Sequence, residues 1–223
     1  MPTRVPAPEF ATLGLDDWRY VAGTLEATFR LTSYAEAGAF ASRVAAAADK
    51  LGHHPAINVR YPGVVHVVTT THEIHAVSER DLALARKLSE LAIGASVVSD
   101  PRASLVVELA IDALDIDAVR PFWKALLAYE DEPPWVEGDT IRAISDPRGV
   151  GPAVWFQQMD EPREQRNRIH FDVLMPHDVA EQRLADALAA GGHLVSDTRA
   201  KAFWILADAE GNEACICTWQ DRE

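Results

Sequence analysis

Cysteine is almost absent from this chain, which has two cysteines, Cys215 and Cys217, among 223 residues. They lie two positions apart in a segment with the pattern of a strand, where both side chains point to the same face. A disulfide between them would be strained. The fold is therefore not expected to depend on disulfides, and we expect a reducing compartment, the cytoplasm.

Long hydrophobic runs and basic residues are also scarce. No apolar run reaches about 18 residues and no basic, apolar leader is seen, so neither membrane insertion nor secretion is indicated. Lys and Arg number 21 against 34 Asp and Glu, which gives a net charge of −13, and the acidic excess lies almost entirely in the second half. Nucleic acids and anionic membranes are bound largely through Lys and Arg, so we expect neither as a partner.

The length fits two domains of about 100 residues each better than one. The segment Ser99-Asp100-Pro101-Arg102 is short and polar, and its proline discourages a continuous helix, so it is predicted to be a linker. We place the first domain at residues 9–97 and the second at residues 104–221.

Alternating apolar and polar residues predict two β-hairpins in the first domain, 18–21 with 25–31 and 57–61 with 64–71. Ser33, with Glu36 three residues later, starts a helix that runs to Leu51, and Ser78 starts a second helix that ends near Gly94. This order predicts an α+β domain, an antiparallel sheet with helices on one face.

Groups able to transfer protons are concentrated in the same domain: His53, His54, His72 and Asp81. Imidazole changes its charge near neutral pH, so such a set indicates acid/base catalysis. Each residue also has a purely structural interpretation. Histidines at the end of a helix gain from its dipole, and Ser78-x-x-Asp81 is a capping pattern.

Together these residues form one longer pattern, Asp49-x3-His53-His54-Pro55-x5-Tyr61-x10-His72-Glu73, followed by Ser78-Glu79-Arg80-Asp81. The pattern closely resembles that of the pterin-4a-carbinolamine dehydratases over roughly residues 9 to 95. In that family the adjacent histidines, the later histidine and the aspartate line the pterin site. Pro55 and Glu73, which lie beside them, are expected to contact the substrate.

The resemblance implies the dehydration of a 4a-hydroxytetrahydropterin to the quinonoid dihydropterin, with no metal or cofactor. His54 and His72 are expected to act as general acid and base, with the assignment between them open. His53 would bind or polarise the hydroxyl that leaves, and Asp81 would hold or tune one of the histidines. The resemblance also implies a homo-oligomer.

The second half repeats one order of elements twice, which implies an internal duplication. The predicted order is strand 105–111, helix 115–128 and strands 140–144 and 153–159, then strand 168–174, helix 178–190 and strands 193–197, 202–207 and 213–219.

Three segments carry a second resemblance: Arg120-Pro121-Phe122-Trp123-Lys124-Ala125-Leu126-Leu127, Asn167-Arg168-Ile169-His170-Phe171-Asp172 and Asp208-Ala209-Glu210-Gly211-Asn212-Glu213. They resemble the glyoxalase-like vicinal-oxygen-chelate domains, which imply paired βαβββ modules around a cleft and, in many members, a divalent metal. Their landmarks put Glu108, Gln157, His170 and Cys215 near the metal positions. Because Cys215 would add a soft thiolate to mostly harder ligands, a metal-free cleft is favoured.

Two alternatives to the dehydratase stay open. The first domain could serve as an assembly module while the glyoxalase-like domain binds a small molecule. Catalysis could also reside in the second domain, as a metal-dependent lyase or dioxygenase.

Overall fold

The chain divides into two separately packed units, residues 1–106 and 107–223. The computed structural model describes residues 2–132, 140–162 and 169–221. The segment 99–102, predicted to be a linker, belongs instead to the first unit. Asp100 donates its N–H to Thr28 O at 2.7 Å, and its carboxylate accepts hydrogen bonds from the Arg30 guanidinium. The domain limits 9–97 and 104–221 stay predictions.

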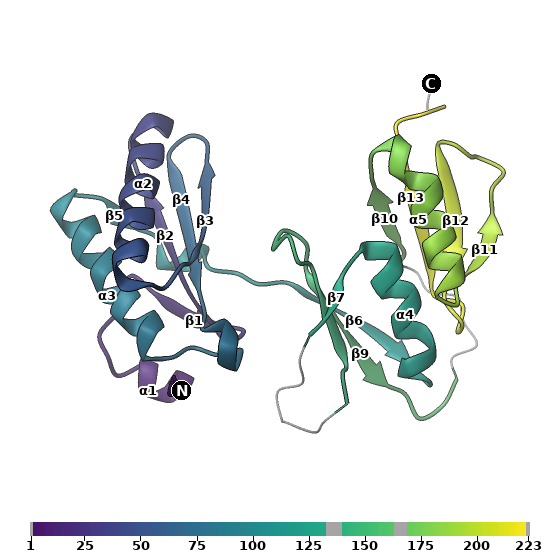
Figure 1. Cartoon of the computed structure of the whole chain (residues 1–223), viewed down its shortest axis with the longest axis horizontal. Coiled ribbons are helices and arrows are strands. Elements are labelled where there is room, and N and C mark those ends of the chain that lie inside the picture. Colours follow the sequence, from purple (N-terminus) through teal and green to yellow (C-terminus); the bar gives the residue numbers. More distant parts are fainter. Residues whose placement is uncertain (1, 133–139, 163–168, 222–223) are drawn as a thin grey trace. The chain divides into compact units, whose positions relative to one another are not determined.

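An antiparallel sheet with two long helices on one face forms the first unit, as predicted (Figure 1). Its strands are β1 (Arg19–Val21), β2 (Thr24–Arg30), β3 (Ala56–Arg60), β4 (Val64–Thr69) and β5 (Val98–Ser99). They are ordered β1-β2-β4-β3, with β5 paired to β2. The helical segments are α1 (Ala7–Phe10), α2 (Tyr34–Leu51), η1 (His72–Ile74), α3 (Glu79–Gly94) and η2 (Pro101–Ala103).

Apolar side chains alternate with other residues along the strands, so they gather on one face of the sheet and form the core of the first unit. On β2, Leu25 and Phe29 are fully buried against the helices, and Val65 and Val67 of β4 extend the same row. Phe40 of α2 meets Phe29 edge to face, with ring centroids 5.2 Å apart. The packed face of the sheet therefore fixes where the ends of α2 and β4 lie.

The two ends of α2 are both capped, and the second cap determines the course of the chain that leads to His53. Ser33 caps the start of helix α2 with its hydroxyl, which accepts the N–H of Glu36, and Gly52 caps its end with a left-handed φ of 62°. The next residue, His53, donates its N–H back to Ala48 O at 3.2 Å. Glycine reaches this conformation without steric cost, so it turns the chain sharply after α2.

Two βαβββ modules form the second unit, which confirms the predicted duplication. The first contains β6 (Glu108–Ala113), α4 (Ile116–Leu127), β7 (Glu130–Asp131), β8 (Ala143–Ser145) and β9 (Ala153–Gln158). The second contains β10 (Phe171–Leu174), α5 (His177–Ala189), β11 (His193–Ser196), β12 (Phe203–Ala207) and β13 (Glu213–Cys217). The sheets are ordered β6-β9-β8-β7 and β10-β13-β12-β11, with β6 parallel to β9 and β10 parallel to β13.

Both modules contribute to one hydrophobic core, and α4 packs against α5 (Figure 1). The indole N–H of Trp123 on α4 donates to Asp208 Oδ2 at 2.9 Å. The Glu210 carboxylate, also from the second module, accepts the N–H groups of Leu114 and Asp115 at 2.9 and 2.7 Å. These contacts hold the modules together as one unit.

The differences from the predicted elements are small. Strand β7 has two residues, too few for alternation to reveal. The strand predicted at 168–174 begins at Phe171, and its predicted first residue, Arg168, lies outside the described residues. In the described ranges, no helix combines the length and the apolar character needed to cross a membrane.

Gly63, in the turn between β3 and β4, should not tolerate a side chain. A Cβ there would collide with the main-chain carbonyl of Leu31, and Leu31 N–H already donates to Gly63 O at 2.7 Å, so the two backbones cannot separate freely. We expect Gly63→Ala to lower the free energy of unfolding of the first unit by about 1–3 kcal/mol. Hydrogen exchange of peptides from β2 and β4 in increasing urea would measure this.

Gly38 provides the matched control. It lies on the exposed side of α2, and a Cβ there meets nothing within 4 Å. Gly38→Ala should therefore stabilise the unit by about 0.5–1 kcal/mol. Equal effects of the two substitutions would contradict the packing described for the turn.

Candidate active site

Asp81, in the first turn of α3, is completely buried, and its carboxylate accepts four hydrogen bonds. Oδ1 accepts from His53 Nε2 at 2.7 Å and from Thr69 Oγ1 at 2.6 Å. Oδ2 accepts from Thr71 Oγ1 at 2.7 Å and from Ser78 N at 2.8 Å. One carboxylate therefore joins the end of α2, the end of β4 and the start of α3.

The local sequence brings these donors together. Thr69 follows Val65 and Val67 on the inward face of β4, so its hydroxyl points to the interior, and Thr71 is fully buried beyond it. Burial on its own would raise the pKa of Asp81. The hydrogen bonds from His53, the two threonines and the backbone of Ser78 outweigh burial and hold the pKa below its ordinary value.

His53 is oriented by this carboxylate. Its side chain is 10% exposed, and Thr69 Oγ1 lies 3.2 Å from the same Nε2 that contacts Asp81. A carboxylate accepts only, so Nε2 carries the proton. The other ring nitrogen, Nδ1, has no hydrogen-bond partner among the described residues, and in the neutral ring it keeps a free lone pair.

His54 and Asp49 form a second, exposed pair. His54 Nε2 donates to Asp49 Oδ1 at 3.1 Å, and the two side chains are 66% and 76% exposed. Such a pair is screened by water and adds little stability. It nevertheless gives the ring a preferred orientation and leaves Nδ1 of His54 accessible.

His72 and Glu73 follow directly after the buried Thr71, on the exposed turn η1. Glu73 accepts from the Arg80 guanidinium at 2.8 Å. A hydrogen bond to its own backbone N–H, followed by the contact with Arg80, lowers the pKa of Glu73. Pro55 is half-buried where β3 begins.

Of the predicted residues, the structure joins His53 to Asp81 and leaves His54, His72 and Glu73 exposed on the surface. Asp81 has no exposed surface, because its carboxylate is enclosed by its four donors. Its part in a substrate site stays a prediction. Asp81 caps α3 and also holds His53, because its Oδ2 accepts the backbone N–H of Ser78 while its Oδ1 binds His53.

Thr69 and Thr71 are site residues that the sequence motif does not mark. Thr69 lies in the inward row of β4, and a hydroxyl in that row needs a buried partner. A threonine at an inward-facing position of the strand was therefore the sequence signal for a buried polar contact. Asp49 was part of the quoted pattern, but the pattern gave it no role.

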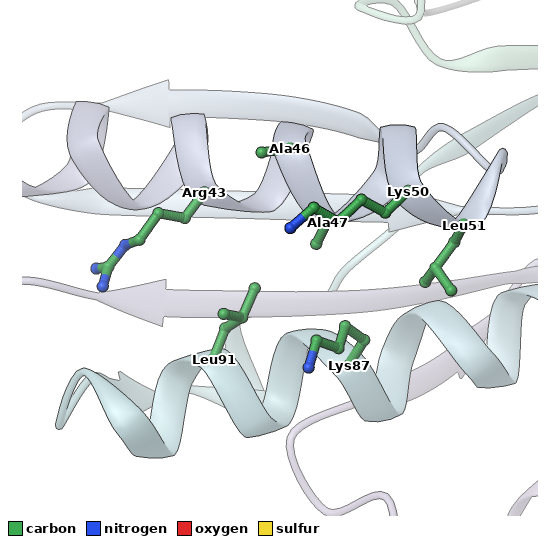
Figure 2. Close-up of a pocket in the computed structure, with 7 residues that line it drawn as sticks. All are labelled: Arg43, Ala46, Ala47, Lys50, Leu51, Lys87 and Leu91. Carbon is green, nitrogen blue, oxygen red and sulfur yellow. The ribbon is translucent and has the colours of Figure 1, made fainter.

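A separate cavity of about 260 Å³ lies between α2 and α3 in the first unit. Figure 2 shows Arg43, Lys50 and Leu51 of α2 facing Lys87 and Leu91 of α3 around it. None of the predicted site residues lines this cavity, so the candidate site is not part of it.

In the second unit, the residues at the expected metal landmarks are divided between the two modules. Glu108 lies on β6 opposite Ala153, and Gln157 lies on β9 opposite Asp112, in the sheet of the first module. In the sheet of the second module, His170 and Cys215 gather instead with Asp172. Burial, together with the nearby Asp172 carboxylate, raises the pKa of the Cys215 thiol to about 11.

The chain thus joins an α+β domain with a histidine and carboxylate site to a unit of paired βαβββ modules. The family model of pterin 4 alpha carbinolamine dehydratase matches residues 6–91, and that of the glyoxalase-like domain matches residues 108–217.

Individual relatives agree with the first match. Over 75 residues, the chain is 47% identical to a Thermomicrobium roseum protein named "Putative pterin-4-alpha-carbinolamine dehydratase", covering 34% of this chain and 80% of that protein. A Nocardia farcinica protein of the same name is 37% identical over 78 residues, covering 35% of this chain and 81% of that protein. The chain belongs to the pterin-4a-carbinolamine dehydratase family through its first unit.

Two solved structures are also similar. A transcriptional coactivator/pterin dehydratase from Brucella melitensis is 30% identical, with a TM-score of 0.38, covering 40% of this chain and 99% of that chain. A glyoxalase/bleomycin resistance protein/dioxygenase family enzyme from Burkholderia phytofirmans is 16% identical, with a TM-score of 0.37, covering 50% of this chain and 95% of that chain.

Replacing Asp81 by Asn tests the buried network. The amide nearly keeps the size of the side chain but removes the charge and places an N–H₂ group among donors. We expect Asp81→Asn to lower the free energy of unfolding of the first unit by about 2–4 kcal/mol at pH 7. Urea denaturation with hydrogen exchange of peptides from α3 and β4 would measure it.

The effect of Asp81→Asn on the free energy of unfolding should depend on pH. Because folding lowers the pKa of Asp81, its carboxylate stabilises the fold fully above the ordinary value of about 4 and loses that effect as the pH falls through the folded-state pKa. The difference in free energy of unfolding between wild type and Asp81→Asn should therefore become smaller in acid. Asp49→Asn, at an exposed position, should change stability by less than about 0.5 kcal/mol. Equal stability of wild type and Asp81→Asn at pH 7 would refute the network.

Proposed function

We propose that the first unit removes water from a 4a-hydroxytetrahydropterin and releases the quinonoid dihydropterin. The observation that carries the proposal is the orientation of His53. Its Nε2 is held by a fully buried carboxylate, Nδ1 has no partner among the described residues, and two exposed histidines lie on the adjoining segments. The dehydratase names of the relatives support the same substrate.

The reaction needs one proton given and one proton taken. The C4a–O bond breaks as the hydroxyl receives a proton and leaves as water, and the N5–H bond then supplies its electron pair to form the C=N bond. The proton of N5 passes to a base. An imidazolium and a neutral imidazole can serve as the acid and the base near neutral pH. Solvent restores both protonation states after each turnover.

The exposed histidines suit these two roles. His54 and His72 would act as general acid and base, and either assignment is compatible with their exposure. The free lone pair on Nδ1 of His53 would accept a hydrogen bond from the C4a hydroxyl and orient it. Asp81 is then a positioning residue, because it acts on the substrate only through His53.

The remaining predicted residues would bind the pterin ring. The half-buried ring of Pro55 offers an apolar surface for a flat heterocycle, and the Glu73 carboxylate can accept hydrogen bonds from the amino and N–H groups of a pterin. We expect the working form to be a homo-oligomer in the cytoplasm.

Loss of either exposed histidine should nearly abolish the activity. We expect His54→Ala and His72→Ala each to slow dehydration by about 10²- to 10⁴-fold, the usual contribution of one acid or base. The assay follows chemically generated 4a-hydroxytetrahydropterin by ultraviolet absorbance, with the spontaneous rate subtracted.

His75 supplies the control, since it is exposed on the same turn and lies outside the family pattern. His75→Asn suits its left-handed φ of 45° and should leave the rate within about twofold of wild type. Near wild-type rates in both His54→Ala and His72→Ala would reject the mechanism. No acceleration by wild type, together with self-association, would favour the assembly module.

A further inference from the structure

The cavity between α2 and α3 is an apolar space at the surface of the first unit. Helix α2 contributes Ala46, Ala47 and Leu51 to its wall, and Leu91 of α3 lies opposite them. The helix is rich in alanine here, from Ala45 to Ala48, and these short side chains leave about 260 Å³ between the two helices. An apolar group of a ligand would fill this space and lose its contact with water.

Three cationic side chains border this space, and no acidic side chain of the described residues lines it. The cations are Arg43 and Lys50 of α2 and Lys87 of α3. Figure 2 shows Lys50 across the cavity from Lys87, with Arg43 at the other end. The chain has four lysines in all, and two of them lie at this one cavity. The cavity is therefore a local site of positive charge on a chain of net charge −13.

Most of this positive charge is not neutralised within the described part of the chain. Lys87 pairs with Glu90 at 2.9 Å, but both side chains are exposed, so water screens the pair. The guanidinium of Arg43 lies over the ring of Phe40, 5.4 Å from its centroid, and Lys50 has no carboxylate partner among the described residues. An anion from outside the chain would therefore meet positive charge that the chain itself leaves uncompensated.

A second copy of this chain is a poor fit for the same surface. In a twofold dimer both partners present the same patch, so the three cations of one copy would lie near those of the other. Like charges at such range repel each other. The size of the cavity also favours a small molecule, since pockets for drug-sized ligands are about 300–1,000 Å³.

We propose that this cavity binds a small amphiphilic anion, a single carboxylate or phosphate group on a short apolar chain. The apolar chain would lie against Ala46, Ala47 and Leu91. The headgroup would accept charge-assisted hydrogen bonds from Lys50 and Lys87. Lysine packs its methylene groups on apolar surface and holds its ammonium group in water, which suits a ligand that is apolar at one end and charged at the other.

The site is independent of the proposed dehydratase activity. None of the residues that line the cavity belongs to the candidate active site. Binding is measured without any assay of dehydration, so the failure of either proposal leaves the other standing.

Calorimetric titration of the full chain with octanoate and with octyl phosphate tests the proposal. Two control compounds separate the contributions, since 1-octanol keeps the chain but lacks the charge, and acetate keeps the charge but lacks the chain. We expect one equivalent of an amphiphilic anion to bind at least about tenfold more tightly than either control compound, because the first loses a hydrogen-bonded charge and the second loses apolar burial. The tighter of the two anions identifies the preferred headgroup.

Three variants locate the ligand. Lys50→Gln and Lys87→Gln keep a good helix former and should each weaken binding about tenfold. Ala46→Leu should fill the cavity and abolish binding with no change in charge. Arg86→Gln is the matched control, because Arg86 is an exposed cation beside Lys87 that does not line the cavity, and its affinity should stay within about twofold of wild type. All four positions are exposed, and circular dichroism checks that each variant is folded.

Two results would overturn the site. One is binding of both anions no tighter than that of 1-octanol or acetate. The other is unchanged affinity in folded Lys50→Gln, Lys87→Gln and Ala46→Leu, which would place the ligand elsewhere. Light scattering examines the remaining occupant. A wild-type oligomer that binds neither anion and that Ala46→Leu dissociates would show that a second copy fills the cavity, and would equally reject the proposal.

Discussion

The Asp81 carboxylate accepts hydrogen bonds from an imidazole, two hydroxyls and a backbone N–H, all inside the first unit. These donors come from the end of α2, the end of β4 and the start of α3. An isolated buried carboxylate would be costly, and its four donors offset that cost. These hydrogen bonds tie the three segments to one another. Because His54 follows His53 and His72 follows Thr71, the same contact also places the two exposed histidines.

This arrangement is better understood as a positioning device than as a source of stability. A buried ion pair often contributes no more than well-packed apolar side chains of the same volume would, although removing one partner alone is destabilising. What an apolar replacement could not provide is a fixed imidazole. The carboxylate keeps the proton of His53 on Nε2 and leaves Nδ1 without a hydrogen-bond partner among the described residues.

Much of the fold could be predicted from local patterns. Alternation revealed the hairpins that contain β2 and β4, and Ser33 and Ser78 marked the helix starts, because these signals lie within a few neighbouring residues. The segment 99–102 was misassigned because its pairing partners, Arg30 and Thr28, lie about 70 residues away. Strand β7 was too short to leave a pattern.

For the candidate sites too, local sequence patterns reveal some residues, whereas others depend on contacts between distant segments. The spacing of His53, His54, His72 and Asp81 was enough to recognise the family. The convergence of Thr69 and Thr71 on Asp81 was not visible, because it depends on how β4 meets α3 in space. In the second unit, cross-strand register decides which side chains meet, and sequence spacing cannot provide that register between β10 and β13.

Nitrogen-15 spectra of the histidine rings in the full, labelled chain would show whether the buried carboxylate orients His53. For the neutral His53 ring we expect the tautomer with the proton on Nε2, a slowly exchanging Nε2–H, and loss of both features in Asp81→Asn. A proton found on Nδ1 of neutral His53, or a spectrum unchanged by Asp81→Asn, would contradict the claim that the buried carboxylate orients the site.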